Sequence, residues 1–349
     1  MDTGYVNARV RGMHSFLLDH KQLNSLILKP DVDSLISELE KTTYREDIQR
    51  AMVTASGVRG VESALRLNLI RTFRKILSFV EGETGEKYVQ IFLCRWDVHN
   101  VKTILRGKRV HIPPQEIRDC LVPAGTLDDA TIVELLKQPD VKAVIDLLAT
   151  WGHDCAVPLT RHFEEYSSRS DLVILEYALD KYYYEQSLSQ VKGRSKDEQI
   201  VRDIVSVEID VINIKSILTL VRDRIDPADG QQILLSGGKY LDMKDLVAML
   251  HETSVPTILP HLEQTPYRFL SELKAPSGTR VKMSVYQSAL DRFLITHGMR
   301  VFRGDPLSIT IIIGFLWAKY TEVINLRIIT RCKNAMITPE EMEAELIYV

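Results

Sequence analysis

The sequence is short of the two residues that interrupt regular structure. It contains 17 glycines and 13 prolines in 349 residues, a smaller share than the roughly 12% that is usual in proteins. A chain with few such residues favours long helices over short strands joined by tight turns. No stretch alternates apolar and polar residues for long enough to predict a strand. The sequence therefore predicts an all-α fold.

Cysteine, excess positive charge and long apolar runs are also scarce. The four cysteines are scattered without a Cys-x-x-Cys pair, which fits a reducing compartment and gives no frame for zinc. The net charge of −3 shows no basic excess of the kind that indicates nucleic acid binding. The longest charge-free stretch, residues 306–318, has thirteen residues, whereas a membrane-spanning helix needs about 20. We therefore expect a chain that binds no nucleic acid and does not cross a membrane by itself.

Motifs that carry catalytic chemistry are missing as well. The sequence has no His-Glu-x-x-His and no Gly-x-Ser-x-Gly, and His153 and His162 do not have the spacing of a metal-binding helix face. Residues 82–87 and 236–239 lack the full glycine and Ser/Thr pattern of a phosphate-binding loop. We expect no catalytic residue, no metal site and no cofactor.

An acid–amide element recurs three times along the chain. Residues 96–105 read WDVHNVKTIL, residues 209–218 read IDVINIKSIL, and residues 322–329 read EVINLRII. The asparagines of these segments, Asn100, Asn213 and Asn325, are 113 and 112 residues apart. Repeats with a long period of this kind indicate an architecture built from copies of one unit.

Three further elements keep the same order around each asparagine. An Ala-Leu pair precedes each asparagine, a proline follows it by fourteen residues, and a pattern of Asp-x3-apolar-x3-Leu belongs to each copy. These elements are, in chain order, Ala64, Ala178 and Ala289; Pro114, Pro227 and Pro339; and Asp31, Asp128 and Asp242. The spacing predicts three similar helical domains at residues 1–108, 109–224 and 225–349, the last with a closing helix in its tail.

Several helix starts are signalled by a capping residue. We expect Asp31, Asp128 and Asp242 to cap short helices. A polar residue followed by proline predicts helix starts at 226–227, 305–306 and 338–339. The stripe formed by Val61, Ala64, Leu65 and Asn68 predicts one buried helix face, because these residues step by three, four and seven.

At 100° per residue, the acid and the amide of each element fall on the apolar face of a helix. We interpret the pairs as a structural polar clamp that bonds a neighbouring helix end or loop backbone, because an unpaired buried polar group costs about 1–3 kcal/mol. A face that grips a partner is the alternative, and catalysis is disfavoured because a reaction needs one asymmetric constellation. The pairs are Asp97 and Asn100, Asp210 and Asn213, and Glu322 and Asn325.

A basic residue follows each amide by two positions and points away from the apolar face. These residues, Lys102, Lys215 and Arg327, are either solvated charges or a basic contact surface.

The motifs together resemble a known family. The opening YVNARVRG at 5–12, WDVHNVK at 96–102, LVPAG at 121–125 and EIDVINIK at 208–215 resemble the C subunit of archaeal-type (A/V-type) rotary ATP synthases. That family includes the d subunit of eukaryotic vacuolar proton pumps. The third copy departs from the pattern, with Glu322 in place of Asp and Arg327 in place of Lys, but keeps the same chemistry.

The resemblance implies a non-catalytic subunit of the central stalk, attached peripherally to the cytoplasmic face of the cell membrane. It implies three helical domains around a pseudo-threefold axis that form a funnel between the membrane rotor ring of proteolipid subunits and the central shaft. Proton or sodium flow would then drive ATP synthesis through this coupling, with Lys102, Lys215 and Arg327 as possible shaft contacts. Two alternatives remain: a cytosolic helical-repeat scaffold that binds another protein, and an enzyme whose site forms between copies around a carboxylate such as Asp97.

Overall fold

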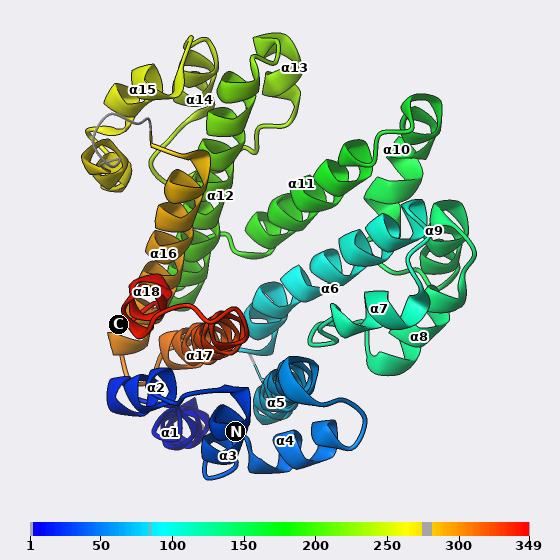
Figure 1. Cartoon of the computed structure of the whole chain (residues 1–349). Helices are drawn as coiled ribbons and strands as arrows, with labels where there is room; N and C mark the ends of the chain where they lie inside the picture. Colours follow the sequence, from blue (N-terminus) through cyan, green and yellow to red (C-terminus); the bar gives the residue numbers. More distant parts are fainter. Residues whose placement is uncertain (1–2, 84, 274–280, 349) are drawn as a thin grey trace. The chain divides into compact units, whose positions relative to one another are not determined.

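Every regular element in the described part of the chain is a helix. The computed structural model describes residues 3–83, 85–273 and 281–348, and all its elements are α-helices or 3₁₀-helices. The prediction of an all-α fold is confirmed (Figure 1). The chain divides into two compact units: unit 1 comprises Met1–Leu175 and Gly298–Val349, and unit 2 comprises Glu176–His297.

Unit 1 joins the two ends of the chain. Its helices are α1 (Thr3–His14), α2 (His20–Ile27), α3 (Val32–Leu39), α4 (Arg45–Met52), α5 (Gly57–Val80), α6 (Glu86–Arg109), α7 (Pro114–Asp119), α8 (Asp129–Lys137), α9 (Val141–Thr150), α10 (Ala156–Arg169), η3 (Val301–Arg303), α17 (Thr310–Asn334) and α18 (Pro339–Glu345). Helices α11 (Val173–Gln190) and α16 (Met283–Arg300) each cross from one unit to the other.

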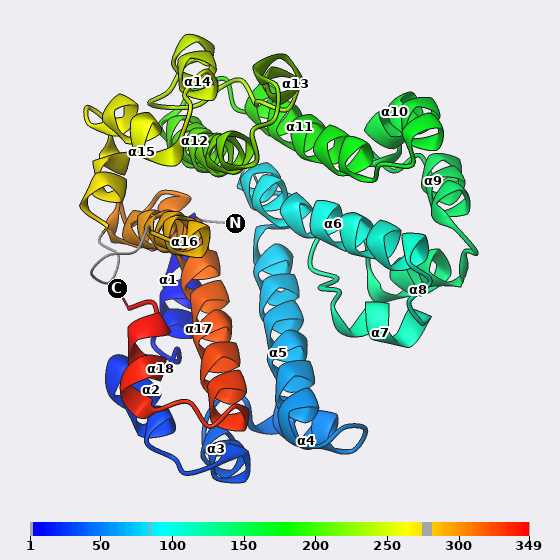
Figure 2. The same ribbon diagram turned by 45° about the horizontal axis from the view of Figure 1, so that its top comes forward.

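The core of unit 1 forms where α17 packs against helices from the first quarter of the chain. Helix α17 contacts α1, α3 and α5, and Figure 2 shows α5 and α17 side by side. Trp317 on α17 lies edge-on to Phe92 on α6, with ring centroids 5.5 Å apart. The predicted stripe on α5 is confirmed as a buried face, because Val61, Ala64 and Leu65 have no exposed surface.

Most of the predicted helix starts are confirmed. The side chains of Asp31, Asp128 and Asp242 cap α3, α8 and α14, and Thr338 forms a capping box with Glu341 at the start of α18. The start expected at residues 305–306 is wrong, because α17 begins at Thr310. The Asp305 carboxylate accepts from the Leu307 N–H inside a turn, so it is not available to cap the helix.

The charge-free stretch at 306–318 belongs to the protein interior. From Ser308 to Trp317 every residue is buried, and only the first two residues of the stretch, Pro306 and Leu307, are exposed. Within residues 3–83, 85–273 and 281–348, none of the helices combines the length and the apolar character that a membrane span requires.

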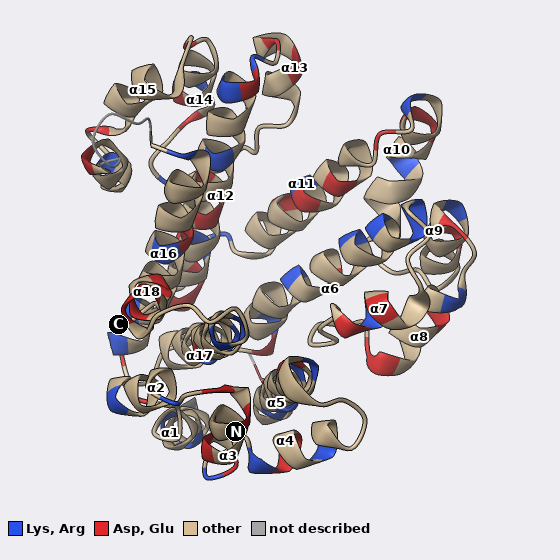
Figure 3. Ribbon diagram, in the orientation of Figure 1, with Lys and Arg blue, Asp and Glu red and all other residues tan. Residues whose placement is uncertain are grey.

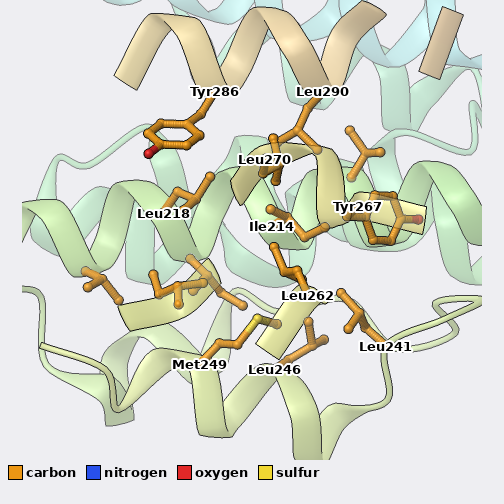
Figure 4. Close-up of a cluster of buried hydrophobic side chains, with 14 of the residues drawn as sticks. Ile214, Leu218, Leu241, Leu246, Met249, Leu262, Tyr267, Leu270, Tyr286 and Leu290 are labelled. Carbon is orange, nitrogen blue, oxygen red and sulfur yellow. The ribbon is translucent and has the colours of Figure 1, made fainter. Parts of the chain in front are cut away.

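Unit 2 is built on the long helix α12. Its elements are α12 (Lys196–Asp223), α13 (Pro227–Gln232), α14 (Met243–Leu250), α15 (Val255–Ile258), η1 (Leu259–Leu262) and η2 (Pro266–Glu272). Figure 4 shows how Ile214 and Leu218 of α12 meet Leu262, Leu270 and Leu290 in one apolar cluster.

A glycine allows two backbone segments of unit 1 to approach closely. A Cβ added to Gly314 on α17 would lie 2.5–2.6 Å from the Cβ, Cα and N atoms of Phe302 in η3. Backbone atoms cannot move aside as a flexible side chain can, so a methyl group at this position forces the two segments apart.

We predict that Gly314→Ala lowers the free energy of unfolding by about 1–3 kcal/mol, the usual cost of overpacking. Gly12→Ala in α1 is the control, because a Cβ there meets no atom within 4 Å. That control should gain up to about 1 kcal/mol from the better helix propensity of alanine. Urea unfolding followed by circular dichroism measures both, and equal effects of the two substitutions would contradict the close approach.

Candidate functional site

Asparagines of the first two acid–amide elements hold the backbone of a loop that follows their helix. The Asn100 Nδ2 donates to the Val122 carbonyl at 2.8 Å, and the Asn100 Oδ1 accepts from the Val122 N–H at 2.8 Å. Asn213 makes the same two bonds to Leu235, both also at 2.8 Å. In both cases the backbone partner lies 22 residues after the amide. One buried side chain thus satisfies both the donor and the acceptor of a loop residue.

The acid that precedes Asn100 binds the next part of the same loop. Asp97 accepts from the N–H groups of Thr126 at 2.8 Å and Leu127 at 2.9 Å, and from the Thr126 hydroxyl at 2.8 Å. A Cβ on Gly125 would lie 2.3 Å from a carboxylate oxygen of Asp97. Only glycine leaves room for this contact between the carboxylate and the loop.

In unit 2, Asp210 has the same arrangement with one addition. It accepts from the N–H groups of Lys239 at 3.1 Å and Tyr240 at 2.9 Å, and from the Tyr267 hydroxyl at 3.0 Å. Gly238 occupies the place of the loop glycine, and a Cβ there would lie 2.0 Å from the carboxylate. Burial, the first cause, raises the pKa of Asp210, while these donors oppose the shift.

The acid–amide element on α17 bonds backbone groups near both ends of the chain. Asn325 makes the two amide bonds to Ile347, at 2.9 and 3.0 Å, again 22 residues later. The acid, Glu322, instead accepts from the N–H of Leu18 at 2.5 Å. The N-terminal segment therefore supplies to Glu322 the kind of backbone donor that residues 126–127 and 239–240 supply to Asp97 and Asp210.

Glu322 also belongs to a buried polar group of three side chains. It accepts from the Tyr44 hydroxyl at 2.5 Å and pairs with Lys319 at 2.6 Å, and Lys319 donates to the Tyr44 oxygen at 2.9 Å. Burial, followed by the charge of Glu322, raises the pKa of Tyr44 well above its ordinary value. Removing Lys319 or Glu322 would leave an uncompensated buried charge, which is costly.

Near Asp97, a cysteine stands at the position where Glu322 and Asp210 have a tyrosine. The N–H groups of Tyr44 and Tyr267 are bonded by the threonine two residues earlier, and the N–H of Cys155 is bonded by His153 two residues earlier. Cys155 therefore takes the tyrosine's place, and the Thr126 hydroxyl, 3.0 Å from His153 Nε2, contacts the acid instead.

Two lysines eight residues after their amides bond the last turn of a short helix. Lys108 Nζ donates to the Leu136 carbonyl at 2.6 Å, and Lys333 Nζ donates to the Ile27 carbonyl at 2.7 Å. Both lysines are buried, and the pKa of each is lowered by desolvation.

These lysine contacts show that the predicted equivalence of the short helices is wrong for Asp31. Leu136 lies eight residues after the cap Asp128, and Ile27 lies eight residues after Asp19, which caps α2. Helix α2 therefore corresponds to α8, whereas Asp31 caps the following helix, α3. The pattern Asp-x3-apolar-x3-Leu describes any capped amphipathic helix, so it cannot separate two adjacent ones.

The long helices of all three elements end in the same turn. His111, Arg224 and Met336 each lie eleven residues after the amide and have φ of 56–57°. The N–H of the next residue bonds a carbonyl five residues back: Ile112 to Gly107, Ile225 to Leu220 and Ile337 to Cys332, at 2.9–3.0 Å. This is the Schellman termination, formed here without the usual glycine.

None of the three basic residues two positions after the amides is fully exposed. Lys102, Lys215 and Arg327 are all half-buried. Lys215 forms an ion pair with Asp291 on α16. The Nε of Arg327 is buried and has no hydrogen-bond partner among the residues that the structure describes.

The opening motif connects α1 to the approach to α17. Asn7 Nδ2 donates to the carbonyls of Pro306 at 2.8 Å and Ser308 at 3.0 Å. The Arg9 guanidinium lies 3.8 Å from the centre of the Phe79 ring. These contacts tie the first helix to the segment before α17 and to the end of α5.

Sequence reasoning missed the glycines and tyrosines around the acids. Gly125 and Gly238 both lie 28 residues after the acid, so a comparison of the copies could have found them. Tyr44 and Tyr267 contact acids that are 278 and 57 residues away, and no local pattern marks such pairs.

We predict that Asn100→Ala lowers the free energy of unfolding by about 2–4 kcal/mol, because the Val122 N–H and carbonyl lose their buried partner. Gln90→Ala on the same helix is the control, because Gln90 is exposed and its side chain donates to the partly exposed Glu86. The difference between the two variants in chemical unfolding is the measurement. An unchanged melting temperature for Asn100→Ala would refute the clamp interpretation.

The environment of Asp97 predicts how the free energy of unfolding depends on pH. Burial raises the pKa of Asp97, with the bonds from Leu127 and Thr126 opposing the shift. Its stabilising contribution is therefore full below the unfolded pKa of about 3.9 and is lost as pH rises through the folded pKa. We expect the stability difference between the wild type and Asp97→Asn to fall as pH rises from about 4 towards 7.

The matched control is Asp128→Asn. Hydrogen bonds from Thr131 lower the pKa of Asp128, so its contribution is present above the unfolded pKa and is lost as pH falls. The difference in unfolding free energy between the wild type and Asp128→Asn should therefore rise over the same pH range, whereas the difference for Asp97→Asn falls. Parallel curves for the two variants would contradict the assignment of a raised pKa to Asp97.

Comparison with known proteins identifies the family. The family described as ATP synthase (C/AC39) subunit matches residues 6–345. The chain is 29% identical over 345 residues to the C subunit of the A-type ATP synthase of Methanocaldococcus jannaschii, covering 98% of this chain and 86% of that one. It is 29% identical over 350 residues to the corresponding C subunit of Haloferax volcanii, covering 98% and 97% of the two chains. The chain belongs to the family of ATP synthase (C/AC39) subunits.

Proposed function

We propose that this chain is a non-catalytic rotor subunit of a membrane-bound rotary ATP synthase. It couples the membrane rotor ring to the central shaft, so that proton or sodium flow drives ATP synthesis. It attaches peripherally at the cytoplasmic face of the cell membrane, and other subunits bind the nucleotide. The observation that carries the proposal is the family match over residues 6–345, together with relatives that are named as C subunits of A-type ATP synthases.

The recurrent clamp supports an architecture of three similar helical domains around a pseudo-threefold axis. Asn100, Asn213 and Asn325 each bond a backbone group 22 residues later, and each long helix ends in the same turn. As the family resemblance implies, we propose that the three domains form a funnel.

The physical task of such a rotor part is to transmit torque without slipping. Close-packed helical interiors deform little and pass strain from one side to the other. The clamps stiffen each long helix against its loop, which suits this task. A stable attachment at each end would bury more than about 1,000 Å².

Lys102, Lys215 and Arg327 are our proposed shaft contacts. Their half-buried stems reduce the side-chain entropy that binding would remove. Lys215 is already paired with Asp291, so its contribution requires an exchange of partners.

Membrane fractionation tests the proposal. We predict that the protein sediments with membranes, is released without detergent at low ionic strength or alkaline pH, and brings shaft and ring subunits with it. A soluble protein that remains free of these subunits would support a cytosolic scaffold instead. An integral marker protein that stays in the pellet is the control for the wash.

A further inference from the structure

The three amide clamps make the same bond to their loops. In each clamp an asparagine Oδ1 accepts from the N–H of one loop residue, at 2.8–3.0 Å. These loop residues are Val122, Leu235 and Ile347. Because the chemistry of the bond is the same, differences in how readily the clamps open depend on how each loop is connected and covered.

The loop on α17 consists of two separate pieces. On α6, the amide bonds Val122 and the acid bonds Leu127 within one short loop. On α17, the amide bonds Ile347, whereas the acid bonds Leu18 of the N-terminal segment. Residues 19–346 run between these two pieces, so no short connection forces them to leave α17 together.

Buried charges fix the N-terminal piece to α17. Lys333 Nζ donates to the Ile27 carbonyl at 2.7 Å and also to the Lys29 carbonyl. Lys319 Nζ donates to the Tyr44 oxygen at 2.9 Å, and both of these side chains are buried. Breaking such contacts leaves a buried charge without a partner. The N-terminal piece is therefore firmly held.

Helix α12 of unit 2 lacks both of these lysines. The positions equivalent to Lys319 and Lys333 hold the buried valines Val207 and Val221. Helix α6 has only the second of the two, Lys108. The pair of charged anchors thus belongs to the clamp whose loop is divided.

The other piece, residues 336–348, is held with little buried surface. We call this segment the strap. It includes α18, which contacts α2 and α17 and lies beside α2 in Figure 2. Among its residues, all of which the structure describes, only Met342 and Leu346 are buried. Met336, in the turn that joins the strap to α17, is 91% exposed.

The polar contacts of the strap differ from those of the N-terminal piece. Figure 3 shows acidic residues in α18. The exposed ones are Glu340, Glu341, Glu343 and Glu345. Beyond the Asn325 clamp, the Tyr348 hydroxyl donates to Asn24 Oδ1 at 3.1 Å, and the Tyr348 ring lies 4.3 Å from the His20 ring. These contacts lack the buried ion pair that fixes the N-terminal piece.

We propose that the strap is a releasable closure of unit 1. It detaches from α2 and α17 while both units stay folded, and its clamp opens before those of α6 and α12. A loop held by helices on both sides gains little conformational entropy when its bonds break, whereas the strap gains more because it is attached through the exposed turn after α17. Release of the strap goes beyond the proposed function and is measured on the isolated protein.

Amide hydrogen exchange of the wild-type protein, resolved to single residues, is the first test. We expect the protection factor of the Ile347 N–H to be at least about tenfold lower than those of Val122 and Leu235. The protection factor of Leu18 should exceed that of Ile347, because the strap leaves alone. Exchange at Ile347 should change little in dilute urea, since a local opening exposes little surface. Equal protection at the three clamp amides, or at Ile347 and Leu18, would overturn the inference.

Tyr348→Phe removes one contact of the strap without leaving a cavity. We expect it to lower the protection of Ile347 by about fivefold, the effect of one hydrogen bond, and to leave the urea midpoint of global unfolding unchanged. Tyr5→Phe, at a tyrosine that is 52% exposed on α1, is the control and should change neither quantity. A loss of protection that spreads to α5, or no change at Ile347, would contradict a strap that opens by itself.

Lys333→Val tests the anchor, because it gives α17 the residue that α12 has. We expect the protection of Leu18 to fall towards that of Ile347. Lys108→Val is the matched control, since Lys108 makes the same kind of bond to α8, and it should leave Leu18 and Ile347 unchanged. If Lys333→Val exposes Ile347 but not Leu18, the lysine holds the strap, and the division into a fixed and a releasable piece is wrong.

Discussion

The pair of hydrogen bonds between an asparagine carboxamide and a loop backbone is the contact on which the rest of the fold depends. A carboxamide donates and accepts at once, so it satisfies the N–H and the carbonyl of one residue. Asn100, Asn213 and Asn325 do this over the same sequence interval. An acid one helical turn earlier takes the next donors, which in two copies are the following N–H groups of the same loop. The direction in which the chain leaves each long helix is thereby set by two buried side chains.

The same contacts explain why the two ends of the chain lie in one unit. The α17 copy takes its loop from Ile347, but its acid and its buried lysine bind Leu18 and Ile27. We propose that this copy is split between the ends of the chain, and that Glu322 and Lys333 join its two parts. A domain boundary at residue 108 or 224 remains a prediction, but the copy that contains α17 requires residues 18–44. Separating the two ends would leave buried charges without partners.

The sequence allowed the all-helical fold, the caps and the position of the acid–amide pairs to be predicted, because all of these depend on local period and residue type. It did not allow us to predict which of α2 and α3 corresponds to α8, because both helices begin with an aspartate cap. The contact between Tyr44 and Glu322 spans 278 residues, and a single sequence contains no signal for such a pair. His111, Arg224 and Met336 adopt a positive φ, and arginine and methionine are not residue types from which a positive φ would be predicted.

A repeated backbone poses a problem for a part that must join two different partners. Equivalent positions present equivalent surfaces, whereas a coupling part needs two dissimilar faces. Side-chain charge can create the difference at no cost to the frame, because the clamps are independent of the residues two positions away. Asp291 pairs with Lys215, whereas the equivalent positions on α17 and α5 hold two arginines, Arg327 and Arg66. One frame therefore holds an ion pair in unit 2 and two arginines at the equivalent positions of unit 1, so the copies differ in side-chain charge while the clamps stay the same.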